Sequence, residues 1–176
     1  SAFGGIHGFG VMFVFDPATL EFTVLHHFDE TESGKFPNGN LLLASNGKLY
    51  GVAKVGGLNV VGTLFEFDIE SSAFTKLFDF KRSVSGAYPR GSMTQASNGK
   101  IYGVTESGGS FEKGVLYEYD PQGNNFEVKL EFDGTNKGAY PRDKLVEYES
   151  NILYGVTGVG GINNDGVIYQ YNTETE

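Results

Sequence analysis

Two arginines stand at matching places in a recurring motif, and their side chains are well suited to hold a ligand. The motif reads Tyr88-Pro89-Arg90 in one copy and Tyr140-Pro141-Arg142 in the next, while an earlier copy, Phe36-Pro37-Asn38, has an amide in that place. An arginine offers a planar fork of donors that can hold a carboxylate or a glycan hydroxyl. Each arginine could instead pair with an acidic neighbour such as Glu106 or stack on a tyrosine. Asn38, Arg90 and Arg142 are therefore candidate binding residues.

Four short segments of different sequence lie inside a constant frame of glycines. They read Ile6-His7-Gly8-Phe9, Leu58-Asn59-Val60-Val61, Ser110-Phe111-Glu112-Lys113 and Ile162-Asn163-Asn164-Asp165. A fixed frame with changing contents is typical of loops that carry binding residues on a rigid scaffold. Asn59, Phe111 and Asn163 are further candidate binding residues, and the alternative is that these segments are unconstrained surface loops.

Metal binding and catalysis find little support in the sequence. His26 and His27 are neighbours in an expected strand, so they point to opposite faces and cannot share a metal; His26 is expected to pack in the core. Asn163-Asn164-Asp165-Gly166 lacks the alternating acidic spacing of a calcium loop. No nucleophile with a base is apparent, and only Glu147 and Glu149 are acids near the expected centre of the fold. We expect no cofactor, no metal and no enzymatic activity.

Composition narrows the range of partners. The 176 residues include 13 Lys and Arg against 22 Asp and Glu, which gives a formal net charge of −9. The resulting field repels a phosphate backbone, so nucleic acid is not expected as a partner. No apolar run approaches the roughly 20 residues that span a bilayer, so membrane insertion is not expected either. The absence of cysteine leaves the redox compartment undetermined.

The elements that must position these residues recur with a period of 52 residues. Gly-Gly pairs begin at Gly4, Gly56, Gly108 and Gly160. Sliding residues 36–87 over residues 88–139 without a gap gives 20 identities in 52 positions. We therefore treat residues 1–176 as one repeat domain, with a partial unit 1–35, whole units 36–87 and 88–139, and a partial unit 140–176.

Apolar residues within a unit alternate with a period of two, which predicts strands. In the first whole unit we expect strand A at about 40–45, B at 48–54, C at 62–68 and D at 74–80. Asn46-Gly47, repeated as Asn98-Gly99, predicts a type I′ turn between strands A and B. Thr63, Phe65 and Phe67 share one face of strand C, and we expect that face to be buried against a neighbouring unit.

A single four-stranded sheet cannot bury both of its faces, so the units are expected to stack face to face. Radial stacking gives an all-β fold of β-propeller type, with four-stranded antiparallel blades of 52 residues. A linear β-solenoid is the alternative. In the propeller arrangement the B–C loops and the D–A connections emerge at one rim, where all the candidate binding residues lie.

About three blades are present, which is too few to close a ring. We favour a segment of a longer propeller, and the alternative is half of a propeller that a second copy completes. Strand edges left unpaired in either case would permit self-association.

The unit pattern also resembles a known family. It runs Asn-Gly-Lys-(Leu/Ile)-Tyr-Gly-Val, then Gly-Gly, then Gly-x-(Leu/Ile)-(Phe/Tyr)-x-(Phe/Tyr)-Asp, then an apolar strand ending in Phe. This resembles the glycine-rich tandem repeats, of Gloeobacter and Verrucomicrobia type, found in secreted bacterial surface proteins. It is distantly similar to kelch blades, although Phe22, Phe74 and Phe126 stand where kelch has Trp. The resemblance spans essentially the whole chain and implies a propeller-type fold and an extracellular or cell-surface location, but no activity.

Three functions are compatible with this sequence. We favour a non-catalytic binding or adhesion module of an exported or cell-surface bacterial protein, because the turns repeat while the rim loops vary. Its ligand would be a protein or a glycan, held on the rim of B–C and D–A loops. A self-assembling structural, filament or spacer module is the second hypothesis. A glycan hydrolase or lyase with acids in a central channel is the third.

Overall fold

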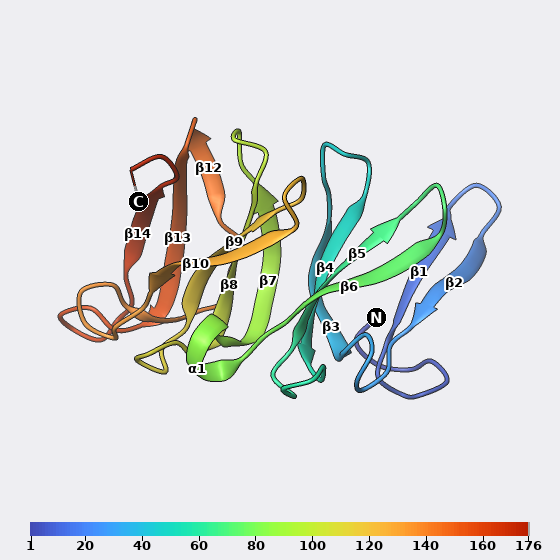
Figure 1. Cartoon of the computed structure of the whole chain (residues 1–176), viewed down its shortest axis with the longest axis horizontal. Coiled ribbons are helices and arrows are strands. Elements are labelled where there is room, and N and C mark those ends of the chain that lie inside the picture. The colour runs from blue at the N-terminus through green and yellow to red at the C-terminus, as the bar shows by residue number, and fades with distance from the viewer. Residues whose placement is uncertain (176) are drawn as a thin grey trace.

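Four twisted antiparallel sheets stand in a row in the computed structural model, which describes residues 1–175 (Figure 1). Sheet 1 pairs β1 (Val11–Asp16) with β2 (Glu21–His27). Sheet 2 has the order β3 (Lys35–Leu43), β4 (Leu49–Val55), β5 (Thr63–Asp68), β6 (Ala73–Asp79). Sheet 3 repeats that order with β7 (Ala87–Gln95), β8 (Ile101–Ser107), β9 (Val115–Asp120) and β10 (Asn125–Glu131). Sheet 4 consists of β11 (Ala139–Pro141), β12 (Val146–Glu149), β13 (Ile152–Val159) and β14 (Ile168–Asn172).

This is the expected all-β fold with four-stranded blades of propeller type. Strands B, C and D of the first whole unit begin and end within one residue of their expected positions. The loops between β4 and β5 and between β6 and β7 emerge at the same end of the sheets, as expected (Figure 1). Within residues 1–175 the one helix is α1 (Arg82–Ser85), a single turn in the β6–β7 connection that the sequence did not predict.

Strand A begins earlier than predicted. β3 starts at Lys35, five residues before the expected position 40, so Pro37 and Asn38 belong to a strand and not to a loop. The same is true of Pro89 and Arg90 in β7. Proline is tolerated here because strand A is the edge strand of its sheet, and an edge residue can lack an N–H without breaking a ladder.

The predicted type I′ turn between strands A and B is wrong. A type I′ turn needs positive φ at both central residues, and Asn46 is not among the residues with positive φ, whereas Gly47 has a φ of 81°. The N–H of Gly47 donates to the carbonyl of Ala44 at 3.0 Å, which gives a three-residue loop closed by a left-handed glycine. Asn151 occupies the same left-handed place in the last unit, with a φ of 69°.

The core lies between neighbouring sheets, as the alternation in strand C predicts. Thr63, Phe65 and Phe67 are all buried. Between sheets 2 and 3, the ring of Phe78 stacks on that of Phe126 with centroids 3.8 Å apart and planes 6° apart. Phe78 and Phe126 are partly buried, and packed aromatic pairs of this kind are worth more than their buried area alone.

Candidate functional site

The two arginines of the recurring motif converge on one carboxylate. The Nη2 atom of Arg142 lies 2.7 Å from Oε1 of Glu106, and the Nε atom of Arg90 lies 2.6 Å from Oε2 of the same side chain. The Arg90 Nε contact is a close ion pair without the alignment of a hydrogen bond. Both arginines therefore share an internal counter-ion, which is the alternative that the sequence left open for each of them.

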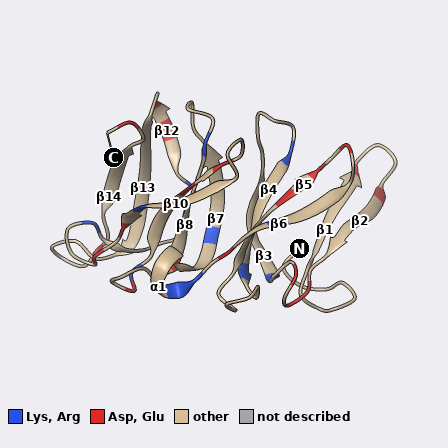
Figure 2. Ribbon diagram, viewed as in Figure 1, with Lys and Arg blue, Asp and Glu red and all other residues tan. Residues whose placement is uncertain are grey.

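A shallow cleft of 440 Å³ surrounds this cluster. Its lining residues are Lys54, Val55, Tyr88, Arg90, Glu106, Ser107, Tyr140 and Arg142. Three cations and one carboxylate give the cleft a positive balance, although the whole chain carries a net charge of −9. Figure 2 shows Lys and Arg on β3, β7 and α1 toward the lower end of the sheets, at the rim where the β4–β5 loop also lies.

Two tyrosines form the cleft walls and are held in an uncommon backbone conformation. Tyr88 has a φ of 57° and Tyr140 a φ of 55°, values that cost energy for a bulky residue. Main-chain hydrogen bonds of 2.8 Å hold them, from the Tyr88 N–H to the carbonyl of Val61 and from the Tyr140 N–H to that of Lys113. The B–C loop of each unit thereby fixes the start of the next strand A, and with it the place of the arginine two residues later.

Cations already cover part of each tyrosine ring. The guanidinium of Arg82 lies 4.9 Å from the centre of the Tyr88 ring, and the ammonium of Lys113 lies 4.9 Å from that of Tyr140. Lys113 also donates a hydrogen bond of 2.9 Å to the Tyr140 hydroxyl. These contacts leave the tyrosines as fixed walls and add positive charge near the cleft.

Sequence reasoning missed Lys54 as a site residue. It occupies the same place in its unit as Glu106 does one period later, and Gly158 follows at the next period. Because this position changes from cation to acid to glycine, it does not stand out as a repeated motif. Comparing equivalent positions on the rim could have shown that Glu106 has a cation as its counterpart.

The other candidate binding residues do not join this cleft. Asn38 lines a separate, mainly apolar cavity of 200 Å³ beside β1. The Asn59 amide donates to the Phe80 carbonyl at 2.9 Å, so it ties the β4–β5 loop to the segment that follows β6. Phe111 is exposed, and Asn163 lines another open surface hollow with Ile162 and Asp165. The structure thus brings together Arg90 and Arg142 of the predicted set.

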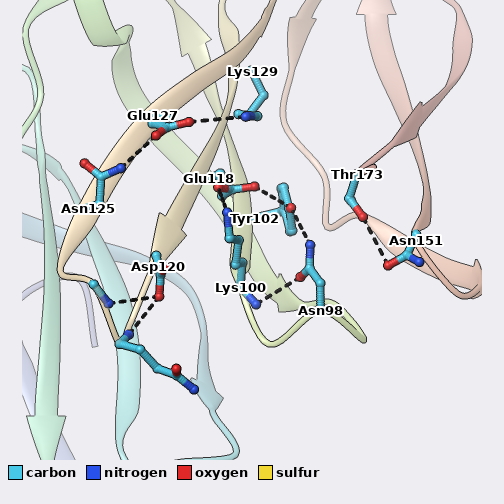
Figure 3. Close-up of polar contacts among 12 residues, drawn as sticks. Asn98, Lys100, Tyr102, Glu118, Asp120, Asn125, Glu127, Lys129, Asn151 and Thr173 are labelled. Carbon is cyan, nitrogen blue, oxygen red and sulfur yellow. Dashed lines mark hydrogen bonds and ion pairs between the residues drawn. The ribbon is translucent and has the colours of Figure 1, made fainter. Parts of the chain in front are cut away.

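A second polar cluster is structural and recurs in sheets 2 and 3 (Figure 3). In sheet 3, Lys100 contacts Oε1 of Glu118 at 2.6 Å, and the hydroxyl of Tyr102 donates to Oε2 at 2.5 Å. The Asn98 amide donates to the Tyr102 oxygen at 2.9 Å. Burial and the bond to Glu118 raise the pKa of Tyr102 well above its usual range. The cluster ties the A–B turn to strand C.

Of the two acids considered for catalysis, Glu147 makes hydrogen bonds within the fold. Glu147 accepts hydrogen bonds from the N–H and hydroxyl of Ser97 and from the N–H of Asn151. Burial opposes its ionisation, but these bonds together lower its pKa. Glu149 is exposed two positions further along β12. Within residues 1–175, no three His, Asp or Glu side chains gather closely enough to hold a metal ion.

Comparison with known proteins identifies a repeat family. A family model, the Gloeobacter/Verrucomicrobia repeat, matches residues 1–169. No curated protein matches the chain by sequence. The helix α1 is too short and too polar to cross a bilayer, and residues 1–175 contain no other helix.

Several solved structures share the fold at low identity. The extracellular domain of a putative one component system from B. thetaiotaomicron has a TM-score of 0.62 at 12% identity, covering 94% of this chain and 20% of that one. TolB from Acinetobacter baumannii has a TM-score of 0.59 at 12% identity, and the match covers 94% of this chain and 36% of TolB. A puromycin-hydrolyzing peptidase from Mycobacterium tuberculosis has a TM-score of 0.55 at 10% identity, and the match covers 88% of this chain and 21% of the peptidase. This chain therefore spans about a fifth to a third of their lengths, and the likeness concerns the fold alone.

Proposed function

The chain belongs to the Gloeobacter/Verrucomicrobia repeat family, and on that premise we propose that it is a non-catalytic binding module of an exported or cell-surface bacterial protein. The proposed ligand is an acidic glycan whose carboxylate enters the cleft between Arg90 and Arg142. The similarity to an extracellular domain supports the location. The observation that carries the binding role is the convergence of two arginines on Glu106 in an open, positively balanced cleft.

The geometry of the arginines favours a carboxylate ligand. Arg142 contacts Glu106 through Nη2, and its side chain is 55% exposed, which leaves room for a second acid to approach it. Arg90 meets Glu106 through Nε without good hydrogen-bond alignment, which leaves its planar fork underused. Lys54 adds a third charge on the same cleft. A ligand carboxylate would form the bidentate contacts that arginine prefers.

The walls of the cleft favour a sugar over an apolar peptide side chain. Tyrosine rings and hydroxyls line it together with Ser107, while Val55 is its one aliphatic residue. A pyranose presents hydroxyl groups for such donors and a flat C–H face for an aromatic ring. An acidic peptide would share the carboxylate contact but would gain little from these walls.

A direct test is calorimetric titration with oligogalacturonate, a uronate oligomer, against its methyl ester as the uncharged counterpart. We expect the double variant Arg90→Ala/Arg142→Ala to bind the acid at least about tenfold more weakly, a loss of about 1.4 kcal/mol. Binding should also weaken as salt is added, because the pairs are partly exposed. Glu106→Gln should bind more tightly, since it removes the internal competitor.

A matched control distinguishes binding at the cleft from nonspecific attraction to positive charge elsewhere on the surface. Lys81→Ala/Lys137→Ala removes two exposed cations outside the cleft, and it should leave the affinity unchanged. Equal binding of the acid and the ester, or full affinity in the arginine double variant, would dismiss the carboxylate cleft. Binding of a poly-glutamate peptide at equal strength would instead assign the site to acidic protein ligands.

A further inference from the structure

The contact between neighbouring sheets occurs repeatedly inside this chain, with the same residues facing each other. Tyr50 of sheet 2 lies 6.0 Å from Tyr119 of sheet 3, measured between ring centres. One period later, Tyr102 of sheet 3 lies 6.3 Å from Tyr171 of sheet 4. Each sheet therefore has two different faces, one that meets the preceding sheet and one that meets the following sheet.

The face of sheet 1 that would meet a preceding sheet is exposed and aromatic. Phe13, Phe15 and Phe22 are 41%, 48% and 56% exposed. The equivalent residues two periods later, Tyr117 and Tyr119, are 1% and 3% exposed because sheet 2 covers them. We call the surface formed by Phe13, Phe15 and Phe22 the leading face.

The face of sheet 4 that would meet a following sheet is also apolar and open. Val156 and Ile168 are 42% and 79% exposed. Their equivalents in sheet 2, Val52 and Leu64, are 2% and 0% exposed under sheet 3. We call the surface formed by Tyr154, Val156 and Ile168 the trailing face.

We propose that the trailing face of one copy of this chain docks on the leading face of a second copy, in the arrangement that sheet 2 has with sheet 3. Tyr154 corresponds to Tyr50, and Phe15 corresponds to Tyr119, so Tyr154 of one copy packs against Phe15 of the next. The occupant is a second copy because each face already has, within this chain, a partner of the opposite kind with the same residue types. The contact is head-to-tail, so the docked pair as a whole keeps one free leading face and one free trailing face.

The strength of the contact follows from its extent. Sheet 1 supplies two strands to the contact, whereas sheets 2 and 3 meet with four strands each, so the docked area is smaller than the internal one. Association is then expected between about 10 μM and 1 mM. The net charge of −9 on each copy opposes docking, so added salt should strengthen it. Added salt is expected to weaken ligand binding in the cleft and to strengthen docking between copies. The two proposals can therefore be tested, and rejected, separately.

The test is sedimentation velocity on the whole chain and on two face variants. The unmodified chain should show a mass that rises with concentration up to about 1 mM. Phe15→Glu removes the leading face and Ile168→Glu the trailing face, and each variant alone should remain monomeric. Mixed together, they should form a 1:1 dimer and nothing larger, because each supplies the one face that the other lacks.

A control and a second measurement keep the result interpretable. Leu58→Glu changes a leucine that is 77% exposed in a loop outside both faces, and it should assemble as the unmodified chain does. Phe15→Cys and Tyr154→Cys chains, which have no other thiols, should be joined by a short thiol cross-linker when mixed. A strictly monomeric unmodified chain, assembly that survives both Glu variants, or a mixture without the 1:1 dimer would overturn the proposal.

Discussion

At the scale of single residues, His26 is a titratable side chain that packs against an aromatic ring. Its ring lies 3.7 Å from that of Phe74 with the planes 3° apart, in the same arrangement as Phe78 on Phe126. This confirms the expectation that His26 packs in the core. Burial lowers the pKa of His26, with a smaller contribution from His27, while Asp29 acts in the opposite direction.

The lowered pKa makes one contribution to stability dependent on pH. Because the folded-state pKa lies below the unfolded value of about 6.5, the contribution is present above that pH and is lost as the pH falls through the folded value. His26→Phe should therefore raise the melting temperature more at about pH 5.5 than at pH 7.5. Thermal unfolding followed by circular dichroism checks this, and His7→Phe, in an exposed loop, is the control. An equal shift at both values would show that charge plays no part.

At the scale of the structural element, the Asn98, Lys100, Tyr102 and Glu118 cluster joins a hairpin turn to the neighbouring strand. Sequence analysis found the repeated Asn-Gly-Lys but assigned it to turn geometry alone. The acid that completes the cluster lies on strand C, 16 residues after the tyrosine, so periodicity within one strand could not reveal it. In the last unit the equivalent residues are Ile152, Tyr154 and Gln170, and the cluster is absent.

That difference supplies a matched pair of variants. Tyr102→Phe leaves Oε2 of the buried Glu118 without its donor, and we expect a loss of about 1–3 kcal/mol in the free energy of unfolding. Tyr154→Phe, which removes the same hydroxyl where no acid accepts from it, should change stability by less than about 0.5 kcal/mol. Urea unfolding measured at low protein concentration gives both values. Similar losses in the two variants would mean that the hydroxyl group acts through solvation and not through Glu118.

The elements also show what the sequence could and could not predict. Apolar alternation located strands B, C and D because each buries one face against a neighbouring sheet. Strand A was placed too late because Pro37 and Gly39 are typical of turns, yet an edge strand with a local irregularity accepts both. The arginine rim was predicted from the period. The cleft itself was not, because it joins Lys54, Glu106 and Arg142 from three different units.

At the scale of the whole molecule, stability is expected to vary along the row of sheets. Sheet 3 is covered on both faces, while sheets 1 and 4 each leave one apolar face open. In repeat proteins stability is close to a sum over units and the contacts between neighbours. The end sheets should then open locally at a lower free energy than the centre.

Hydrogen exchange measured by mass spectrometry tests this gradient. Amides of β8 and β9 should exchange most slowly, and those of β1, β2 and β14 most rapidly. At concentrations where head-to-tail docking occurs, protection of β1 and β14 should rise while that of β8 and β9 stays constant. Uniform protection from end to end would show that the row unfolds as one cooperative body.

The recurrence of the same contacts at each step has a consequence for how such genes change. Copying one whole unit within the coding sequence inserts a sheet whose two faces match the neighbours on either side, so no new core has to be selected. Loss of a whole unit should be equally well tolerated, whereas a duplication of half a unit would break the strand order of a sheet. Natural variants of this chain should therefore differ in length by whole units, and their ligand range should diverge through the rim positions while the packing residues stay the same.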